Sequence, residues 1–275
     1  MTNTQEIKLQ PFQMHKNLYF IGNEDVSVHL IVTEEGLILI DTGFPEMHDL
    51  ILNNIKSLGY DPKNICAIFH SHGHLDHFAN TQDYAKLSGA KTYISRIDND
   101  ILNGKRDLSW AKEMGLKPLP FFDCDVLLED GDTFTFGSTT IRCIHTPGHT
   151  EGVMSFIITL DDNGDKCVVA MHGGIGLNSM TAEYLTQNGL PLDLREKFKE
   201  GLKRLALEDV DLLIGNHPEQ TRTLKKMVKV LNGETDLRNK ADWPEFLAWN
   251  KARVDKLLKS EEEEKAKTDA GIAGV

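Results

Sequence analysis

The segment SHGHLDH at residues 71–77 constrains this chain more than any other. It follows NICAIFH (64–70), a short apolar run that predicts a buried β-strand. His72 and His74 are two positions apart, so at the end of a strand both side chains point to the same side. One isolated histidine usually has a structural explanation, whereas three histidines and an aspartate at this spacing predict a metal site.

The next two polar residues of this segment predict a second ion. Asp76 and His77 are adjacent and point in different directions where the chain turns into a helix. They cannot easily bind the ion that His72 and His74 would hold, so we expect two ions side by side. Imidazole nitrogens and a carboxylate suit Zn²⁺, with iron or Mn²⁺ as alternatives.

Further ligands are expected from distant parts of the chain, because four side chains cannot complete two coordination shells. His149 lies in HTPGHT, where Pro147 and Gly148 favour a tight loop after a strand. His217 lies in LLIGNHPE, directly after another apolar run. We therefore expect three strand ends to place their imidazoles at one common site.

The pattern HxHxDH, followed by TPGHT and by a late histidine after a strand, resembles the metallo-β-lactamase superfamily of binuclear metallohydrolases. The resemblance extends from residue 17 to about residue 232. It implies a metal-dependent hydrolase with two zinc ions per chain. The ligands that it implies are His72, His74 and His149 for one ion, and Asp76, His77 and His217 for the other.

Two more residues are expected to support these ligands without binding the ions. LIDTG (39–43) resembles the early DTG turn of the superfamily, which implies that Asp41 orients the metal histidines. A metal-binding imidazole needs an acceptor for its other N–H, although a plain turn residue is the alternative for Asp41. His70, two residues before the first histidine of the motif, is assigned a similar supporting role.

The chain departs from the superfamily pattern at one position. Typical hydrolases of the superfamily have a bridging aspartate after the strand that here reads KCVVAM (166–171), but this chain continues with HGGIG. Three roles for His172 stay open: a ligand of the second ion, a residue of the substrate pocket, and packing at the strand end. Lactamases of the superfamily also lack the bridging aspartate, so hydrolysis is not excluded.

The order of predicted elements indicates a layered α/β protein. Each half of the chain begins with antiparallel strands and closes with a strand followed by a helix. We expect a four-layer αββα sandwich in which two mixed β-sheets are flanked by helices. The predicted single domain spans residues 1–260, with a helical insertion or lid at 97–122 and a charged, disordered tail at 261–275.

The expected reaction is hydrolysis of an ester, thioester, lactone or amide bond in a small substrate. Water bound to zinc loses a proton near neutral pH, so a zinc-bound hydroxide is the expected nucleophile. Asp76 is expected to orient that water and to carry its proton to the leaving group. Core packing explains the candidate residues of the substrate pocket equally well; they are Trp110, Phe121, Phe122 and Asn178.

Composition excludes some partners. The chain has 30 lysine and arginine residues against 42 aspartate and glutamate residues, a formal charge of −12 that repels phosphate backbones. It shows neither a Sec-type leader nor an uninterrupted run of about 18 apolar residues. We therefore expect a cytoplasmic protein with a small-molecule substrate and with no nucleic-acid or membrane partner. The helical C-terminal region is a candidate homodimer interface.

Two alternatives to hydrolysis stay open. One is a mononuclear iron dioxygenase-type oxidoreductase of the same superfamily, which metal analysis and an oxygen-uptake assay would distinguish from a hydrolase. The other is a non-catalytic metal-binding protein, which the missing bridging aspartate keeps in consideration.

Overall fold

Two β-sheets stacked face to face form the centre of the protein. The computed structural model describes residues 8–117 and 119–272. The seven strands of the first sheet are hydrogen-bonded in sequence order: β1 (Phe12–His15), β2 (Leu18–Phe20), β3 (His29–Thr33), β4 (Gly36–Ile40), β5 (Ile65–Phe69), β6 (Lys91–Ser95) and β7 (Val126–Leu128). The five strands of the second sheet have the order β12 (Leu212–Ile214), β11 (Asp165–Met171), β10 (Met154–Asp162), β9 (Thr139–His145) and β8 (Thr133–Phe136).

Both sheets are mixed, and this determines which strand ends meet. Strands β1 to β4 pair antiparallel, whereas β4 to β7 pair in parallel. In the second sheet β11 and β12 are parallel and the other neighbours are antiparallel. The backbone N–H of Met154 donates to the carbonyl oxygen of Ser71 at 2.8 Å. This bond joins the start of β10 to the end of β5, both interior strands, so strand ends of the two sheets meet on one side of the sandwich.

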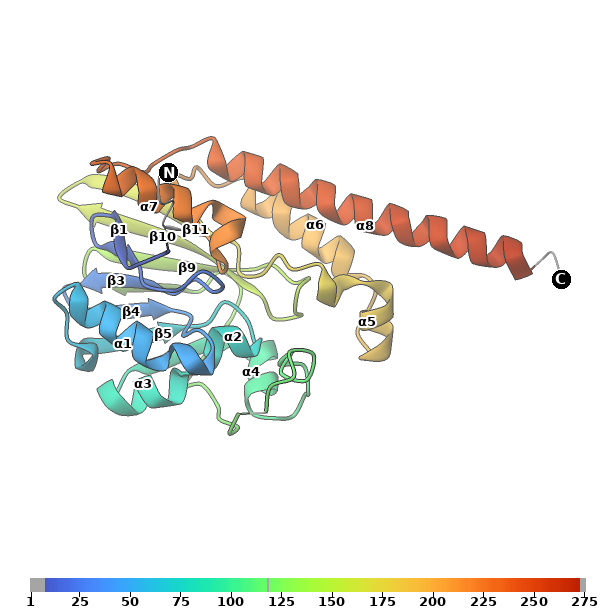
Figure 1. The fold of residues 1–275 in the computed structure, drawn as a ribbon, viewed down its shortest axis with the longest axis horizontal. Coiled ribbons are helices and arrows are strands. Elements are labelled where there is room, and N and C mark those ends of the chain that lie inside the picture. The colour runs from blue at the N-terminus through green and yellow to red at the C-terminus, as the bar shows by residue number, and fades with distance from the viewer. Residues whose placement is uncertain (1–7, 118, 273–275) are drawn as a thin grey trace, which may run out of the picture.

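Helices cover the outer face of each sheet (Figure 1). The first sheet packs against α1 (His48–Ser57) and α3 (Thr81–Ser88), and the second packs against α6 (Leu194–Leu205) and α8 (Asp242–Ile272). The predicted four-layer αββα sandwich is therefore confirmed. The remaining helices are α2 (Leu75–Phe78), α4 (Arg96–Leu102), α5 (Ala182–Gln187), α7 (Thr223–Leu231), and the short 3₁₀ helices η1 (Pro45–Met47), η2 (Pro62–Asn64), η3 (Asn178–Met180) and η4 (Pro218–Thr221).

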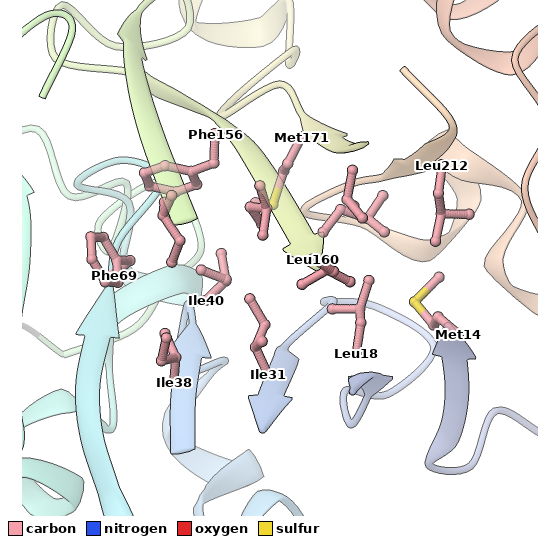
Figure 2. Packing of buried hydrophobic residues seen from close by; sticks show 14 of the residues in the cluster. Met14, Leu18, Ile31, Ile38, Ile40, Phe69, Phe156, Leu160, Met171 and Leu212 are labelled. Atoms are coloured by element: carbon pink, nitrogen blue, oxygen red, sulfur yellow. The ribbon is translucent and has the colours of Figure 1, made fainter. Parts of the chain in front are cut away.

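The core between the sheets follows the period of two expected for buried strands. In β4, Ile38 and Ile40 face the second sheet, whereas Leu39 packs beneath the outer helices. Figure 2 shows side chains of both sheets meeting in this layer. The ring centroids of Phe69 and Phe156, from opposite sheets, lie 6.0 Å apart. Apolar packing thus fixes the two sheets relative to each other.

The C-terminal segment differs from its prediction. Residues 261–272 continue α8 instead of forming a disordered tail, and residues 273–275 lie outside the described part of the chain. Glutamate, lysine and alanine have high helix propensities, and residues that extend an existing helix bear no nucleation cost. Although α8 has 31 residues, neither it nor any other described helix is apolar enough over its length to cross a membrane.

The segment predicted as a helical insertion or lid, residues 97–122, has little regular structure. It begins within α4, and its described residues beyond Asn103 form turns and irregular chain. Trp110 in this segment has φ of 64°, a left-handed conformation that bulky residues rarely adopt. The surrounding contacts must therefore hold this residue in place.

Replacing Phe156 with alanine is expected to reduce the free energy of unfolding by about 3–5 kcal/mol, because its ring is fully buried between the sheets. Chemical unfolding followed by circular dichroism measures this change. Leu207→Ala is the control, because Leu207 is 85% exposed and should change stability by no more than about 0.5 kcal/mol. Equal stability of the two variants would contradict the packing described here.

Candidate metal centre

Six side chains from three chain segments meet beside the strand ends where the two sheets contact each other. They are His72, His74, Asp76 and His77 after β5, His149 after β9, and His217 after β12. They form two groups, within each of which the potential ligand atoms lie within 4.8 Å of one another: His72, His74 and His149, and Asp76, His77 and His217. The structure brings together all six predicted ligands, in the two predicted groups.

The imidazole rings of the first group surround a common centre. The ring centroid of His72 lies 4.7 Å from that of His74 and 4.8 Å from that of His149. Nδ1 of His149 lies 2.9 Å from the carbonyl oxygen of Gly176. A carbonyl oxygen can only accept, so Nδ1 carries the proton and Nε2 presents its lone pair.

The second group places two imidazole nitrogens around one carboxylate oxygen. Nε2 of His77 lies 3.1 Å from Oδ2 of Asp76, and Nε2 of His217 lies 3.6 Å from the same oxygen. Nδ1 of His217 donates to the carbonyl oxygen of Asp25 at 2.7 Å, which directs the lone pair of Nε2 toward Asp76. Three electron-rich atoms that converge in this way can share one cation.

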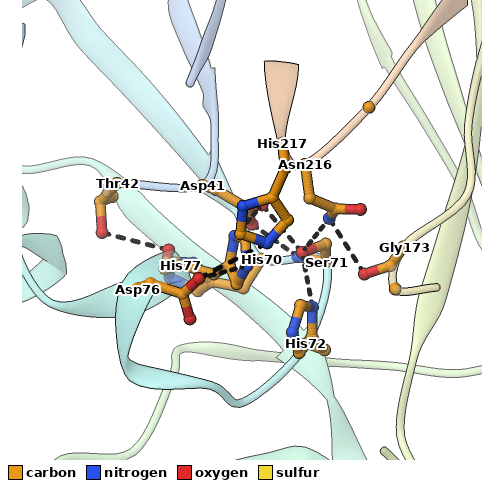
Figure 3. A network of polar contacts seen from close by, with 12 residues as sticks. Asp41, Thr42, His70, Ser71, His72, Asp76, His77, Gly173, Asn216 and His217 are labelled. Atoms are coloured by element: carbon orange, nitrogen blue, oxygen red, sulfur yellow. Dashed lines mark hydrogen bonds and ion pairs between the residues drawn. The ribbon is translucent and has the colours of Figure 1, made fainter. Parts of the chain in front are cut away.

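Asp41 connects the two groups, directly to His77 and through Ser71 to His72 (Figure 3). Its Oδ2 accepts hydrogen bonds from Nδ1 of His77 at 2.9 Å and from the Ser71 hydroxyl at 2.8 Å. Because this hydroxyl donates to Asp41, its Oγ accepts from Nδ1 of His72 at 3.0 Å. Nε2 of His72 is then buried with no hydrogen-bond partner among the described residues, as expected of a nitrogen that binds a metal.

The electrostatics of both groups suit divalent cations. Burial disfavours the charged form of His77, but the carboxylates of Asp76 and Asp41 outweigh it and raise its pKa to about 10. Burial also opposes ionisation of Asp76, yet the facing imidazoles, His77 foremost, hold its pKa well below the usual range. In the first group, burial lowers the pKa of both His72 and His74, so these rings are neutral. The carboxylates of Asp76 and Asp41 that raise the pKa of His77 also attract a metal cation, and such a cation would replace the proton on Nε2 of His77, so the residues of both groups fit two ions.

His172 joins neither group. Its Nδ1 accepts from the backbone N–H of Gly174 at 3.2 Å, and its ring centroid lies 5.2 Å from that of Phe198. Burial lowers the pKa of His172 to about 3, so the ring is neutral. It does not line the cavity of about 700 Å³ that opens onto both groups. Of the three roles left open by the sequence, the structure favours packing at the strand end, because the ring of His172 packs against Phe198 of α6 and does not line the cavity.

His70 is buried behind the cluster and reaches it only indirectly. Its Nε2 lies 3.1 Å from Oγ1 of Thr81, which lies 3.2 Å from Oγ1 of Thr42. The backbone N–H of Thr42 donates to the carbonyl oxygen of His77 at 2.8 Å. The support that His70 gives therefore passes through Thr81 and Thr42 to the backbone of His77.

A cavity of about 700 Å³ opens onto both groups. Trp110 and Asn178 line it, as the sequence predicted. The ring centroid of Trp110 lies 5.4 Å from that of His74 and 4.8 Å from that of Tyr184 on α5. The irregular segment after α4 thus contributes an aromatic wall directly beside the first group.

The two phenylalanines predicted for the pocket lie elsewhere, so that prediction is wrong. Phe121 is 66% exposed, and Phe122 packs against Phe78. The backbone N–H of Phe122 donates to the carbonyl oxygen of Leu102 at 3.1 Å, which holds this part of the chain against the end of α4. Neither phenylalanine lines the metal cavity.

Two buried polar residues that the sequence analysis missed hold the ligand loops together. Oδ2 of Asp98 accepts from the backbone N–H of Gly73 at 2.8 Å and from the hydroxyl of Thr150 at 2.6 Å, which joins the first and second ligand loops. Nδ2 of Asn216 donates to Oγ of Ser71 at 2.9 Å and to the carbonyl oxygen of Gly173 at 3.0 Å. These partners are far apart in sequence, so no local pattern could have identified them.

Comparison with known proteins agrees with this geometry. The family model described as the metallo-beta-lactamase superfamily matches residues 21–162. The chain is 24% identical to an uncharacterized protein of Aquifex aeolicus over 78% of this chain and 95% of that protein. It is 27% identical to an N-acyl homoserine lactonase of a Bacillus species over 50% of this chain and 59% of that protein. The structure of native FEZ-1 metallo-beta-lactamase from Legionella gormanii superimposes with a TM-score of 0.83 and 26% identity, over 92% of this chain and 97% of that chain.

An αββα sandwich with two groups of candidate metal ligands at the strand ends where its sheets meet, together with these similarities, defines a metallohydrolase. The chain belongs to the metallo-beta-lactamase superfamily.

Asp41→Asn is expected to reduce the affinity for metal by about 10–100-fold, because it removes the charge that orients His77 and Ser71. Competition with a chromogenic chelator measures this affinity. Asp49→Asn is the matched control, because the Asp49 side chain is 89% exposed. An affinity unchanged in Asp41→Asn would argue against the supporting role.

His172→Asn is expected to retain both metal ions, because an asparagine oxygen can replace Nδ1 as acceptor for the N–H of Gly174. Elemental analysis of the purified variant counts the metals per chain. His217→Asn serves for comparison and should lose one of the two ions. Loss of a metal from His172→Asn would restore the ligand role for that residue.

Proposed function

We propose that this protein uses two zinc ions to hydrolyse an ester, thioester, lactone or amide bond in a small substrate. The observation that carries the proposal is that both ligand groups line one cavity of about 700 Å³, a size suited to a small molecule. Similar proteins include a lactonase and a metallo-beta-lactamase, whose names support the same class of reaction.

Bound zinc ions would lower the pKa of a coordinated water and polarise the carbonyl group of the substrate. The protein's own groups position the reactants and move the protons. Asp76 turns its Oδ2 toward His77 and His217, which leaves Oδ1 to accept a proton from the attacking water. The same oxygen can then pass that proton to the leaving group.

Trp110 provides an apolar surface over the first ligand group. Its left-handed backbone conformation, with φ of 64°, turns the ring toward His74 and Tyr184. Strained conformations of this kind are concentrated at functional sites, where the surrounding structure compensates for their cost. The ring can contact an apolar part of the substrate and keep bulk water away from the reacting carbonyl.

The alternative of a mononuclear iron dioxygenase has less support. Each group offers three potential ligand atoms within 4.8 Å of one another, which favours a binuclear site. Oxygen uptake by iron-loaded protein without hydrolysis of any carbonyl substrate would reverse this preference. A small-molecule substrate and a cytoplasmic location belong to the same proposal.

Removal of metal by a chelator should abolish hydrolysis, and added zinc should restore it. His74→Ala is expected to lower kcat/KM for the best substrate by about 100-fold or more, because it removes a ligand of the first ion. Chromogenic ester, thioester, lactone and cephalosporin substrates provide the assay, with metal counted in each preparation. His48→Ala is the control, because His48 lies outside the site and contacts Asp49. Full turnover by His74→Ala would contradict the mechanism.

A further inference from the structure

One cationic side chain enters the wall of the metal cavity from α8. Arg253 lines this cavity together with the metal-binding histidines. Its Nη1 donates to the carbonyl oxygen of Ile175 at 3.1 Å and to Oδ1 of Asn250 at 2.9 Å. Its Cζ lies 4.4 Å from the centre of the Trp249 ring. These neutral contacts hold the guanidinium in one position without neutralising its charge.

Arg253 differs from most arginines of this protein in having no carboxylate partner among the described residues. Burial lowers its pKa, and no nearby carboxylate offsets that effect. A half-buried charge without a counter-charge is unfavourable, so its position calls for an explanation. Six of the seven other arginines lie within 4.0 Å of a carboxylate oxygen, namely Arg96, Arg106, Arg142, Arg195, Arg204 and Arg238, and the seventh, Arg222, is exposed.

The free edge of this guanidinium has the geometry that a carboxylate requires. Nη1 is engaged by Ile175 and Asn250, whereas Nε and Nη2 make no hydrogen bond to the described residues. These two nitrogens form the fork that binds a carboxylate through two parallel hydrogen bonds. Lysine offers no such fork, and among the described lining residues of the cavity Arg253 is the one lysine or arginine.

The loop that accepts a hydrogen bond from this guanidinium also contacts the first ligand group. Arg253 donates to the carbonyl of Ile175, and the next carbonyl, that of Gly176, accepts from Nδ1 of His149. One short loop therefore anchors both an imidazole that faces the metal and the cation at the cavity wall. The other charged lining residues, apart from the histidines, are the acidic Asp25, Asp76 and Glu219.

We propose that Arg253 binds a carboxylate of the substrate, and that the natural substrates are acyl compounds with a carboxylate a few bonds from the carbonyl that is attacked. This inference rests on the proposed hydrolase function and specifies its substrate class. The fork of Arg253 would hold one end of the substrate while the carbonyl lies at the ligand groups. Fixing both ends orients the carbonyl for attack.

A pair of chromogenic esters of equal chain length tests this proposal on the metal-loaded protein. Mono-4-nitrophenyl adipate carries the carboxylate, and 4-nitrophenyl hexanoate lacks it. Arg253→Gln is expected to raise KM for the adipate ester by about 10–100-fold and to change kcat/KM for the hexanoate ester by less than about twofold. Arg253→Lys retains the charge but not the fork, so its KM should lie between those of the native protein and Arg253→Gln.

Arg222→Gln is the matched control. Arg222 lines a different cavity, beside Trp249 and Glu245, and its replacement removes the same unit of charge. We expect no change in KM for either ester. An equal rise in KM for the adipate ester in Arg222→Gln and Arg253→Gln would indicate a general effect of net charge and would overturn the proposal.

Isothermal titration calorimetry measures the binding of amides that carry a terminal carboxylate and have four to eight carbons. Because this measurement needs no turnover, it tests the carboxylate site independently of the proposed hydrolase function. Tighter binding by the native protein than by Arg253→Gln, about tenfold or more for at least one chain length, supports the carboxylate site. Equal affinity of the two proteins for every member, or no binding to either, overturns it. Arg253-dependent binding without hydrolysis of any of the ester, thioester, lactone and cephalosporin substrates would overturn the hydrolase function alone. Thermal unfolding confirms that the variants are folded.

Discussion

Four of the five imidazoles that face the metal sites depend on a hydrogen bond at Nδ1, the ring nitrogen that points away from the centre of each group. A neutral imidazole has one donor and one acceptor, so a fixed Nδ1–H directs the lone pair of Nε2. The acceptors are Ser71 for His72, Asp41 for His77, the carbonyl of Gly176 for His149 and the carbonyl of Asp25 for His217. The site is therefore oriented by the protein itself.

This orientation requires the two sheets to keep a fixed relative position, because the acceptors and the imidazoles come from segments of both sheets. The apolar layer around Phe69 and Phe156 provides the packing, and the hydrogen bond from Met154 to Ser71 joins the strand ends beside which the candidate ligands lie. Asp41 follows β4 and lies beside the same strand ends. Its φ of 63° is unusual for a residue other than glycine, and its hydrogen bonds offset the cost of that conformation.

The loop that follows β11 contacts both a candidate metal ligand and the cation at the cavity wall. Through the carbonyl of Gly176 it orients His149, and through the carbonyl of Ile175 it holds Arg253 of α8. The C-terminal helix therefore contributes a cation to the cavity and does more than cover the second sheet. A fold shared by a whole superfamily can in this way bring a different side chain to the substrate, because the covering helix is independent of the metal ligands.

The sequence by itself, through its motifs and their resemblance to a superfamily, predicted the six candidate ligands and the layered fold. Paired histidines at the end of an apolar strand have a fixed relative direction, and alternating strands and helices limit the architecture. Only the tertiary structure decided that Asp98 and Asn216 join the ligand loops, that Phe121 and Phe122 lie outside the cavity, and that Arg253 enters it. Local patterns report the period of one strand or helix, whereas these residues are defined by contacts between segments far apart in the chain.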